Sequence, residues 1–351
     1  MIGRRTLFQS FLTAFASLLS VRSPKAESNP VAQPRNAATA ERAVWKSFYE
    51  DTRVWGYVDK HSATPGERFN IMLSTGPGQT KVKGKIEIFR FGYYAKADRE
   101  LVWTAEDVEA SRQEVQMTAS SAGACWPTEV QDVETTGWRS GYYTIDFVDA
   151  EDGHRDLNVA CIVVTNPAKS GDILVQLSTN TYQAYNAWGG SSFYESAFIG
   201  DRAQMISFNR PTPPDFLINE YYFVLWLEEL AAKHKWKIDY VSNFDVYRDP
   251  AWVKSYKLFV SGSHNEYLSR EEFDAVHHRI FNLGKNTLFL GANTAYWQVR
   301  YADIDLPPGQ ANRGRQLICY KSEDDPIQQR VSVKEAGLLV TDKFREGARR
   351  P

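Results

Sequence analysis

Strand-like and helix-like segments alternate through the second half of the chain, and this alternation limits the possible folds more than any other feature. The runs "ILVQLS", "KIDYVS", "YKLFVSGS" and "NTLFLGAN" predict buried strands. Residues 218–235 and 269–285 have apolar side chains at helical spacing, and Ser269 and Glu272 form a capping-box pattern. Strands joined by helical crossovers form parallel sheets. We therefore predict a doubly wound α/β parallel-sheet domain over residues 168–351.

The first half of the chain has a β pattern instead. The segments "RFNIMLST", "GKIEIFRFGYY", "GYYTIDFV" and "NVACIVVTN" are short and rich in β-branched and aromatic residues. Glycine, proline and aspartate separate them at intervals typical of a sandwich, and no long helical period interrupts them. This pattern predicts an all-β immunoglobulin-like sandwich over residues 46–167, preceding the α/β domain.

The N-terminus has the layout of an export signal. Arg4 and Arg5 precede an apolar stretch that is too short to span a bilayer well, and small residues follow it. The paired arginines favour a twin-arginine signal over residues 1–26, with a general secretory signal as the alternative. Residues 27–45 are expected to form a linker. We therefore expect a periplasmic or otherwise exported protein with no membrane span after signal removal.

Composition excludes several classes of function. A net charge of -2 offers no electrostatic surface for nucleic acid. The three cysteines, Cys125, Cys161 and Cys319, have no CxxC spacing, which argues against a thiolate zinc site, and we expect all three to be buried as small apolar residues.

Beyond residue 300 the pattern fades, and the ending "KFREGARRP" leads us to expect a C-terminally truncated chain.

Three predicted strand ends carry dense polar and aromatic residues: 178–194, 261–269 and 291–297. Because the carboxyl ends of parallel strands open at one edge of a sheet, we expect these segments to meet there. His264 and Glu266 lie two apart on an extended segment, so they share a face and could form an acid–base pair. No Gly-x-Ser-x-Gly elbow, Walker loop or G-x-G-x-x-G turn is present. The candidates are Tyr182, Tyr185, Asn186, Tyr194, His264, Glu266 and Asn293.

These segments also resemble a known family. "TYQAYNAWGGSSFY", "SGSHNEYLS" and "GANTAYWQVRY" are similar to signature segments of the N,N-dimethylformamidase large (beta) subunit-like family. The likeness extends upstream through "GWRSGYYTIDF" and "IEIFRFGYY", so that it covers about residues 50 to 345. It implies a formamide hydrolase with one iron held by two tyrosines and a glutamate, close to a histidine and an asparagine. It also implies a β-sandwich module before an α/β catalytic domain.

The resemblance assigns metal ligands in this chain. Glu266 would be the carboxylate ligand, and Tyr185 and Tyr194 would be the two phenolate ligands. Tyr182 and Tyr222 are alternatives for the second tyrosine. Phenolate and carboxylate oxygens are hard anionic donors that suit Fe3+, and three of them would neutralise its charge. Tyrosine has an ordinary pKa of about 10, so only a strong local cation keeps two rings ionised at neutral pH.

The resemblance also assigns the catalytic roles. His264 would exchange a proton with the metal-bound water, and Asn293 would hydrogen-bond the substrate carbonyl or that water. Glu266 is both ligand and member of this catalytic group. A metal can lower the pKa of its bound water to about 7, which makes the water a nucleophile toward an amide carbon. The expected activity is hydrolysis of the C–N bond of a small linear amide.

Two other functions fit parts of the sequence. The many aromatic residues would also suit a non-catalytic periplasmic protein that binds a glycan or peptide on a degenerate α/β domain. A zinc or manganese enzyme with His264 as a direct ligand is the other alternative. The best-known amidase of the family works with a small partner subunit, so a small subunit or a homo-oligomer is expected.

Overall fold

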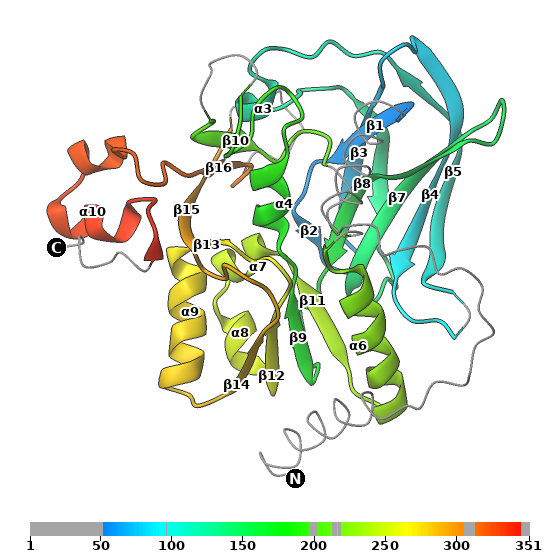
Figure 1. The fold of residues 1–351 in the computed structure, drawn as a ribbon. Helices are drawn as coiled ribbons and strands as arrows, with labels where there is room; N and C mark the ends of the chain where they lie inside the picture. The colour runs from blue at the N-terminus through cyan, green and yellow to red at the C-terminus, as the bar shows by residue number, and fades with distance from the viewer. Residues whose placement is uncertain are drawn as a thin grey trace, which may run out of the picture. The chain divides into compact units, whose positions relative to one another are not determined.

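The computed structural model describes residues 52–95, 97–196, 202–212, 216, 219–304 and 313–344. It shows a mixed α/β protein whose described residues form four sheets (Figure 1). The predicted signal segment 1–26 and the predicted linker 27–45 lie outside the described residues. Within those residues, we find no helix with the length and apolar character needed to cross a membrane.

Two sheets in the first half share one hydrophobic core. The core includes the fully buried side chains of Ile71, Ile88 and Ile145, which come from both sheets. One sheet has the order β1 (Val54–Val58), β3 (Arg68–Thr75), β6 (Thr128–Glu134), and its neighbours are antiparallel. The other has the order β2 (Ser62–Ala63), β8 (Arg155–Val164), β7 (Gly141–Asp149), β4 (Lys81–Phe91), β5 (Arg99–Ser111).

The predicted parallel sheet is present in the second half, and each of its neighbouring pairs is parallel. Its order is β11 (Ile238–Val241), β9 (Ile173–Gln176), β12 (Leu258–Ser261), β14 (Asn286–Phe289). The chain runs from β9 to one edge at β11 and then returns past β9 to β12 and β14. The carboxyl ends of β9 and β12 are therefore adjacent, because these two strands pair directly.

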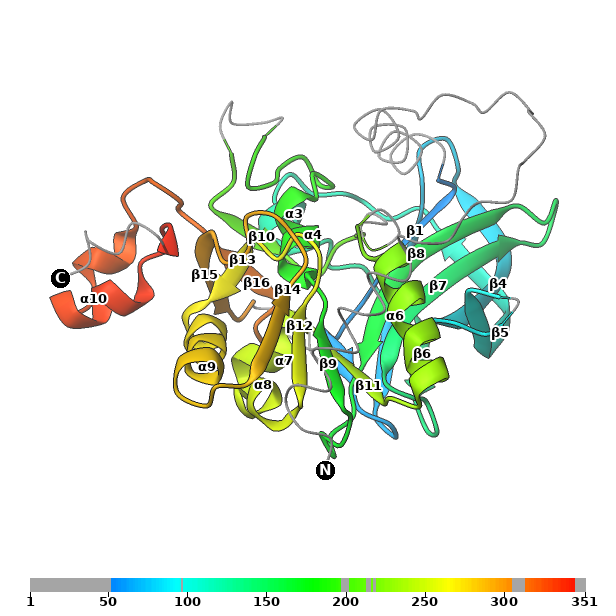
Figure 2. The ribbon, with the colours of Figure 1, turned by 60° about the horizontal axis from the view of Figure 1, so that its bottom comes forward.

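Helices cover both faces of this sheet. The helices α7 (Asn243–Arg248), α8 (Ala251–Ser255) and α9 (Arg270–Phe281) share a hydrophobic cluster with Val241 of β11. Tyr240 alternates with Val241 and therefore faces the other side, where its hydroxyl donates to Glu228 of α6 (Tyr221–His234). Figures 1 and 2 both show α6 apart from the group formed by α7, α8 and α9.

The predicted start of α9 is confirmed atom by atom. Ser269 has an extended backbone, and its hydroxyl accepts a hydrogen bond from the Glu272 amide, while the Glu272 carboxylate accepts one from the Ser269 amide. This reciprocal pair satisfies two amides that have no partner within the helix.

A fourth, mixed sheet was not anticipated from the sequence. Its order is β10 (Met205–Ser207), β16 (Gln316–Ile318), β15 (Trp297–Ala302), β13 (Tyr267–Ser269). After it come the 3-10 helix η1 (Pro326–Gln329) and α10 (Val333–Leu339). Asp325 joins this segment to β15, because its buried carboxylate accepts from the Arg300 guanidinium and from Thr341.

The cysteines differ from the expectation that all three are buried. Cys319 is buried, but Cys161 is half-buried and Cys125 is exposed. Cys125 lies in the irregular segment after α3 (Ala119–Ala122), with φ 53°, and its side chain is exposed. The expectation was therefore wrong for Cys125, since its place on the surface overrides the general tendency of cysteine to be buried.

Candidate functional site

A short helix carries the first site tyrosine. The predicted strand-end segment 178–194 begins with α4 (Thr179–Tyr185), and Tyr185 is its last residue. The Asn186 side chain then holds the turn by accepting from the Trp188 amide at 2.9 Å. Gly189 and Gly190 have φ of 81° and 94°, which only glycine adopts readily. The chain reverses here, so that the Tyr194 ring stacks on the Tyr185 ring with 4.3 Å between centroids.

The second segment, 261–269, brings a carboxylate to these rings. Glu266 lies between β12 and β13, and its side chain is 5% exposed. Its Oε2 lies 2.9 Å from the Tyr185 hydroxyl and 3.0 Å from the Tyr194 hydroxyl. The Nε2 of His264, whose side chain is 28% exposed, lies 3.1 Å from the same oxygen. The structure therefore brings together four predicted residues from two strand ends.

Burial and hydrogen bonding act in opposite directions on the carboxylate of this cluster. Burial alone would raise the pKa of Glu266, but hydrogen bonds from His264, Tyr185 and Tyr194 outweigh burial and hold this pKa below its ordinary value. Burial and the contact with Tyr185 raise the pKa of the Tyr194 phenol well above its ordinary value. Without a metal, Glu266 is thus an ionised carboxylate that accepts hydrogen bonds from the hydroxyls of Tyr185 and Tyr194.

The spacing of the three oxygens also fits a metal ion. The hydroxyls of Tyr185 and Tyr194 are 3.0 Å apart, and each lies 2.9–3.0 Å from Oε2 of Glu266. Adjacent ligands of an octahedral ion with metal–oxygen distances of about 2.0–2.1 Å are about 2.9 Å apart. In the described part of the chain, no group of three His, Cys, Asp or Glu side chains could hold a metal. A three-ligand site at Glu266 therefore requires the tyrosine oxygens.

Two residues that the sequence did not single out complete the cluster. The Tyr267 hydroxyl donates to the Tyr194 hydroxyl at 2.8 Å. The Lys321 ammonium lies 3.6 Å from the centre of the Tyr194 ring and donates to the Phe193 carbonyl at 2.8 Å. Burial lowers the pKa of Lys321 to about 8. Tyr267 lies inside the predicted strand-end segment 261–269, but no local sequence pattern distinguishes Lys321.

The two alternative tyrosines lie elsewhere. The Tyr182 hydroxyl bonds to the Glu220 carboxylate in a buried pair. Tyr222 is 78% exposed on α6, where its ring contacts Tyr221. Among the three tyrosines considered for the second position, only Tyr194 reaches Glu266.

The third segment, 291–297, approaches the cluster through its backbone. The amides of Tyr296 and Trp297 both donate to the Glu266 carbonyl at 3.0 Å. Asn293 occupies an exposed turn with φ 55°, and within the described residues no hydrogen bond joins its side chain to the cluster. Its contact with a substrate stays a prediction.

A buried polar network supports the loop that carries His264 and Glu266. Asn265, between them, is fully buried, and its amide nitrogen donates to Gln176 Oε1 and Ser261 Oγ at 3.0 Å each. Its oxygen accepts from Asn243 at 3.1 Å. The carboxylate of Glu272 accepts from both Gln176 and Asn243, and burial raises its pKa to about 8. The network therefore ties the loop to β9, β12, α7 and α9.

A glycine lets the neighbouring loop pack against this one. A Cβ atom on Gly291 would lie 1.3 Å from the Ser263 carbonyl oxygen and 3.0 Å from the His264 amide nitrogen. No side chain fits at that distance, so any other residue would force the two loops apart. The position of the His264–Glu266 loop therefore depends on Gly291.

Residues 85–351 match the family model described as N,N-dimethylformamidase beta subunit-like, C-terminal. The chain belongs to this family. No curated protein matches it. A solved chain from a study of T cell specificity and activation by the bacterial superantigen toxic shock syndrome toxin-1 is 11% identical, with a TM-score of 0.20. The alignment covers 32% of this chain and 98% of that one, and a likeness this weak carries no argument.

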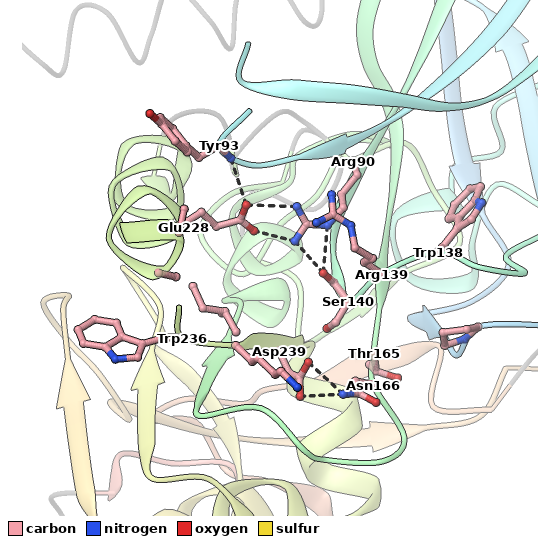
Figure 3. A pocket seen from close by; sticks show the side chains of 15 residues that line it. Arg90, Tyr93, Trp138, Arg139, Ser140, Thr165, Asn166, Glu228, Trp236 and Asp239 are labelled. Carbon is pink, nitrogen blue, oxygen red and sulfur yellow. Dashed lines mark hydrogen bonds and ion pairs between the residues drawn. The ribbon is translucent and has the colours of Figure 1, made fainter. Parts of the chain in front are cut away.

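In this dimethylformamidase-like protein, a separate cavity lies between the two halves of the chain. It has a volume of about 520 Å3, and no residue of the tyrosine–glutamate cluster lines it (Figure 3). Two of its charged groups, Arg90 and Glu228, pair with each other. Arg90 of β4 binds Glu228 of α6 through both terminal nitrogens, at 3.2 and 2.7 Å, and Asp239 accepts from Asn166. We therefore interpret its walls as a structural junction between β4 and α6.

Proposed function

We propose that this protein is an exported, iron-dependent amidohydrolase that cleaves a small linear amide. The observation that carries the proposal is the triangle of oxygens from Tyr185, Tyr194 and Glu266, with His264 beside it. Membership of the dimethylformamidase-like family supports the same chemistry. We propose one Fe3+ per chain, because two phenolates and one carboxylate would balance its charge.

Held by these three oxygens, Fe3+ would supply Lewis acidity, which polarises an amide carbonyl and acidifies a water molecule. His264 is the group placed to take the proton of the attacking water, since its Nε2 borders Glu266 and its ring is partly open to solvent. The water oxygen bonds to the amide carbon, the C–N bond breaks, and His264 returns the proton to the leaving nitrogen. The products are a carboxylate and an amine.

The remaining residues position these groups. Tyr267 donates to the oxygen of Tyr194 and would stabilise negative charge on it. We propose that Asn293 binds the substrate carbonyl from its exposed turn.

Export and the domain organisation of the protein are also part of the proposal. The N-terminal segment with Arg4 and Arg5 supports export to the periplasm, and the two antiparallel-rich sheets support an immunoglobulin-like module before the catalytic α/β region. We propose that the protein acts with a small subunit or as a homo-oligomer.

The test is metal analysis of the purified protein alongside variants. We expect about one iron per chain and a visible absorption band from phenolate-to-iron charge transfer. Glu266→Gln should lose the iron, and Tyr194→Phe should lose or shift the band. Tyr222→Phe is the matched control, because its ring is exposed on α6, and it should change neither.

Two outcomes would contradict the proposal. A folded wild type that contains no metal after iron-replete growth would favour the non-catalytic binding protein. Zinc or manganese in place of iron, without a visible band, would make His264 the group to test as a direct ligand. With iron present, a screen of small amides for amine release identifies the substrate.

A further inference from the structure

A second, smaller cavity also borders α4, and no residue of the tyrosine–glutamate cluster lines it. It has a volume of about 60 Å3, and α4 contributes Thr179, Tyr182 and Gln183 to its wall. One buried water needs about 10–15 Å3 by the same measure, so the cavity holds only a few atoms. Its lining includes Arg315 and Lys60, whose ammonium pairs with Glu67 at 4.0 Å, but no aspartate or glutamate. The cavity is therefore small and positively charged.

Arg315 is the main source of this charge. Its side chain lies almost entirely inside the protein, since the residue is 3% exposed. Its Nε donates to Asn209 Oδ1 at 2.7 Å, and its Nη2 donates to the carbonyls of Val58 and Phe208 at 2.7 and 3.0 Å. Within the described residues, its Nη1 has no hydrogen-bond partner, and no carboxylate lies within ion-pair distance. The charge of Asp59 acts on Arg315, but the Asp59 carboxylate accepts from Asn70.

Two other buried arginines show how this protein normally satisfies such a group. Arg210 and Arg279 are both fully buried. In each of them, Nε, Nη1 and Nη2 all donate to backbone carbonyls. Arg315 differs because one of its three nitrogens is left over, and the side chain lines a cavity.

We propose that this cavity binds one small monovalent anion, either a halide or a short carboxylate such as formate. A buried guanidinium without a negative partner is costly, and an anion against Nη1 would remove that cost. Tyr57 supplies a second donor, because its oxygen accepts from the Trp126 amide and its own proton is available. His61 stays neutral, since burial lowers its pKa well below the ordinary value. The site is thus built around Arg315 and Tyr57.

The first test uses the wild-type protein. Its melting temperature is measured in chloride, bromide and formate, against gluconate at the same ionic strength, so that general screening by salt cancels. We expect a saturable rise with the small anions and none with gluconate, which is too large for the cavity. A response to halides alone or to formate alone identifies which kind of anion the site takes. Bromide-soaked crystals should show an anomalous peak in contact with Arg315 Nη1.

The second test uses matched variants. Arg315→Gln should weaken anion binding by at least about tenfold, the loss expected for one charge-assisted hydrogen bond. Arg279→Gln, the control, should be less stable than wild type but should respond to the anions as wild type does. If Arg315→Gln fails to fold, the wild-type anion series and the bromide peak still decide. Equal melting temperatures in all four anions, with no bromide peak at Arg315, would overturn the proposal. No iron is needed, so this result is independent of the proposed catalysis.

Discussion

Replacing Asn265 with alanine tests whether the buried polar network holds the proposed metal ligands in place. The substitution removes three buried hydrogen bonds. Gln176 Oε1 then loses the only hydrogen bond that it receives from a described residue, and one amide proton of Asn243 also loses its acceptor. A buried polar group left without a partner costs about 1–3 kcal/mol. We therefore expect the free energy of unfolding to fall by about 2–4 kcal/mol.

The iron affinity of Asn265→Ala should fall as well. A loss of iron beyond that of an equally destabilised variant shows that Asn265 positions the metal ligands. Loss of groups that orient metal ligands typically lowers metal affinity about 10- to 100-fold. The assay is urea unfolding followed by tryptophan fluorescence, together with iron retention and the visible band during dialysis against a chelator. Glu266 itself is unchanged in this variant, so any lost iron reflects the position of its loop.

Thr135→Ala is the matched control for Asn265→Ala. Thr135 is also fully buried, and its hydroxyl donates to the carbonyls of Thr64 and Glu67 at 2.8 Å, far along the chain from the cluster. It should lose stability but hold iron as the wild type does. An Asn265→Ala protein that is destabilised yet retains iron as tightly as Thr135→Ala would refute the positioning role.

Three further predictions follow from other contacts. Glu228→Gln leaves the buried Arg90 without a counter-charge, so it should lower the free energy of unfolding by about 3–5 kcal/mol in urea titrations. The double variant with Arg90→Met and Glu228→Leu removes both charges and should recover most of this loss. Burial tends to raise the pKa of Asp325, but hydrogen bonds from Arg300, Ile327 and Thr341 outweigh burial and hold this pKa below its ordinary value. The ionised carboxylate therefore stabilises the fold above the ordinary aspartate pKa of about 3.9, and this stabilisation is lost as the pH falls below that value. Acid titration should therefore show a slope that Asp325→Asn lacks, and identical slopes would count against the ion pair. Gly291→Ala should lower both the melting temperature and iron retention, because its added methyl group would overlap a carbonyl oxygen; wild-type values would contradict that packing.

Local patterns were enough to predict the regular part of the fold. The capping box at Ser269 and Glu272 and the strands at 68–75 and 141–148 depend on residues close in sequence, and the structure contains them as predicted. The mixed sheet was missed because β10 and β13, two of its four strands, have only three residues each. A run of three residues has no measurable period, and such a strand exists only because a distant partner pairs with it.

The candidate site likewise has a part that the sequence predicted and a part that only the packing of distant segments shows. Residue type and motif pointed to Tyr185, Tyr194, His264 and Glu266, since these lie where strands end. The sequence favoured Tyr194 as the second tyrosine but left Tyr182 and Tyr222 as alternatives. Only the packing places these side chains: Tyr182 bonds to Glu220, while the glycine turn folds Tyr194 back over Tyr185.

The sequence by itself determined the four strands of the parallel sheet, the two long helices, the cap of α9 and the residue types at the strand ends. These follow from hydrophobic period and short-range hydrogen bonds, which act between neighbours in the chain. Only the tertiary structure placed Lys321 against Tyr194, Asn265 under its loop and Arg315 beside a cavity. Those contacts join residues far apart in sequence, so they depend on how the sheets pack and leave no local signal.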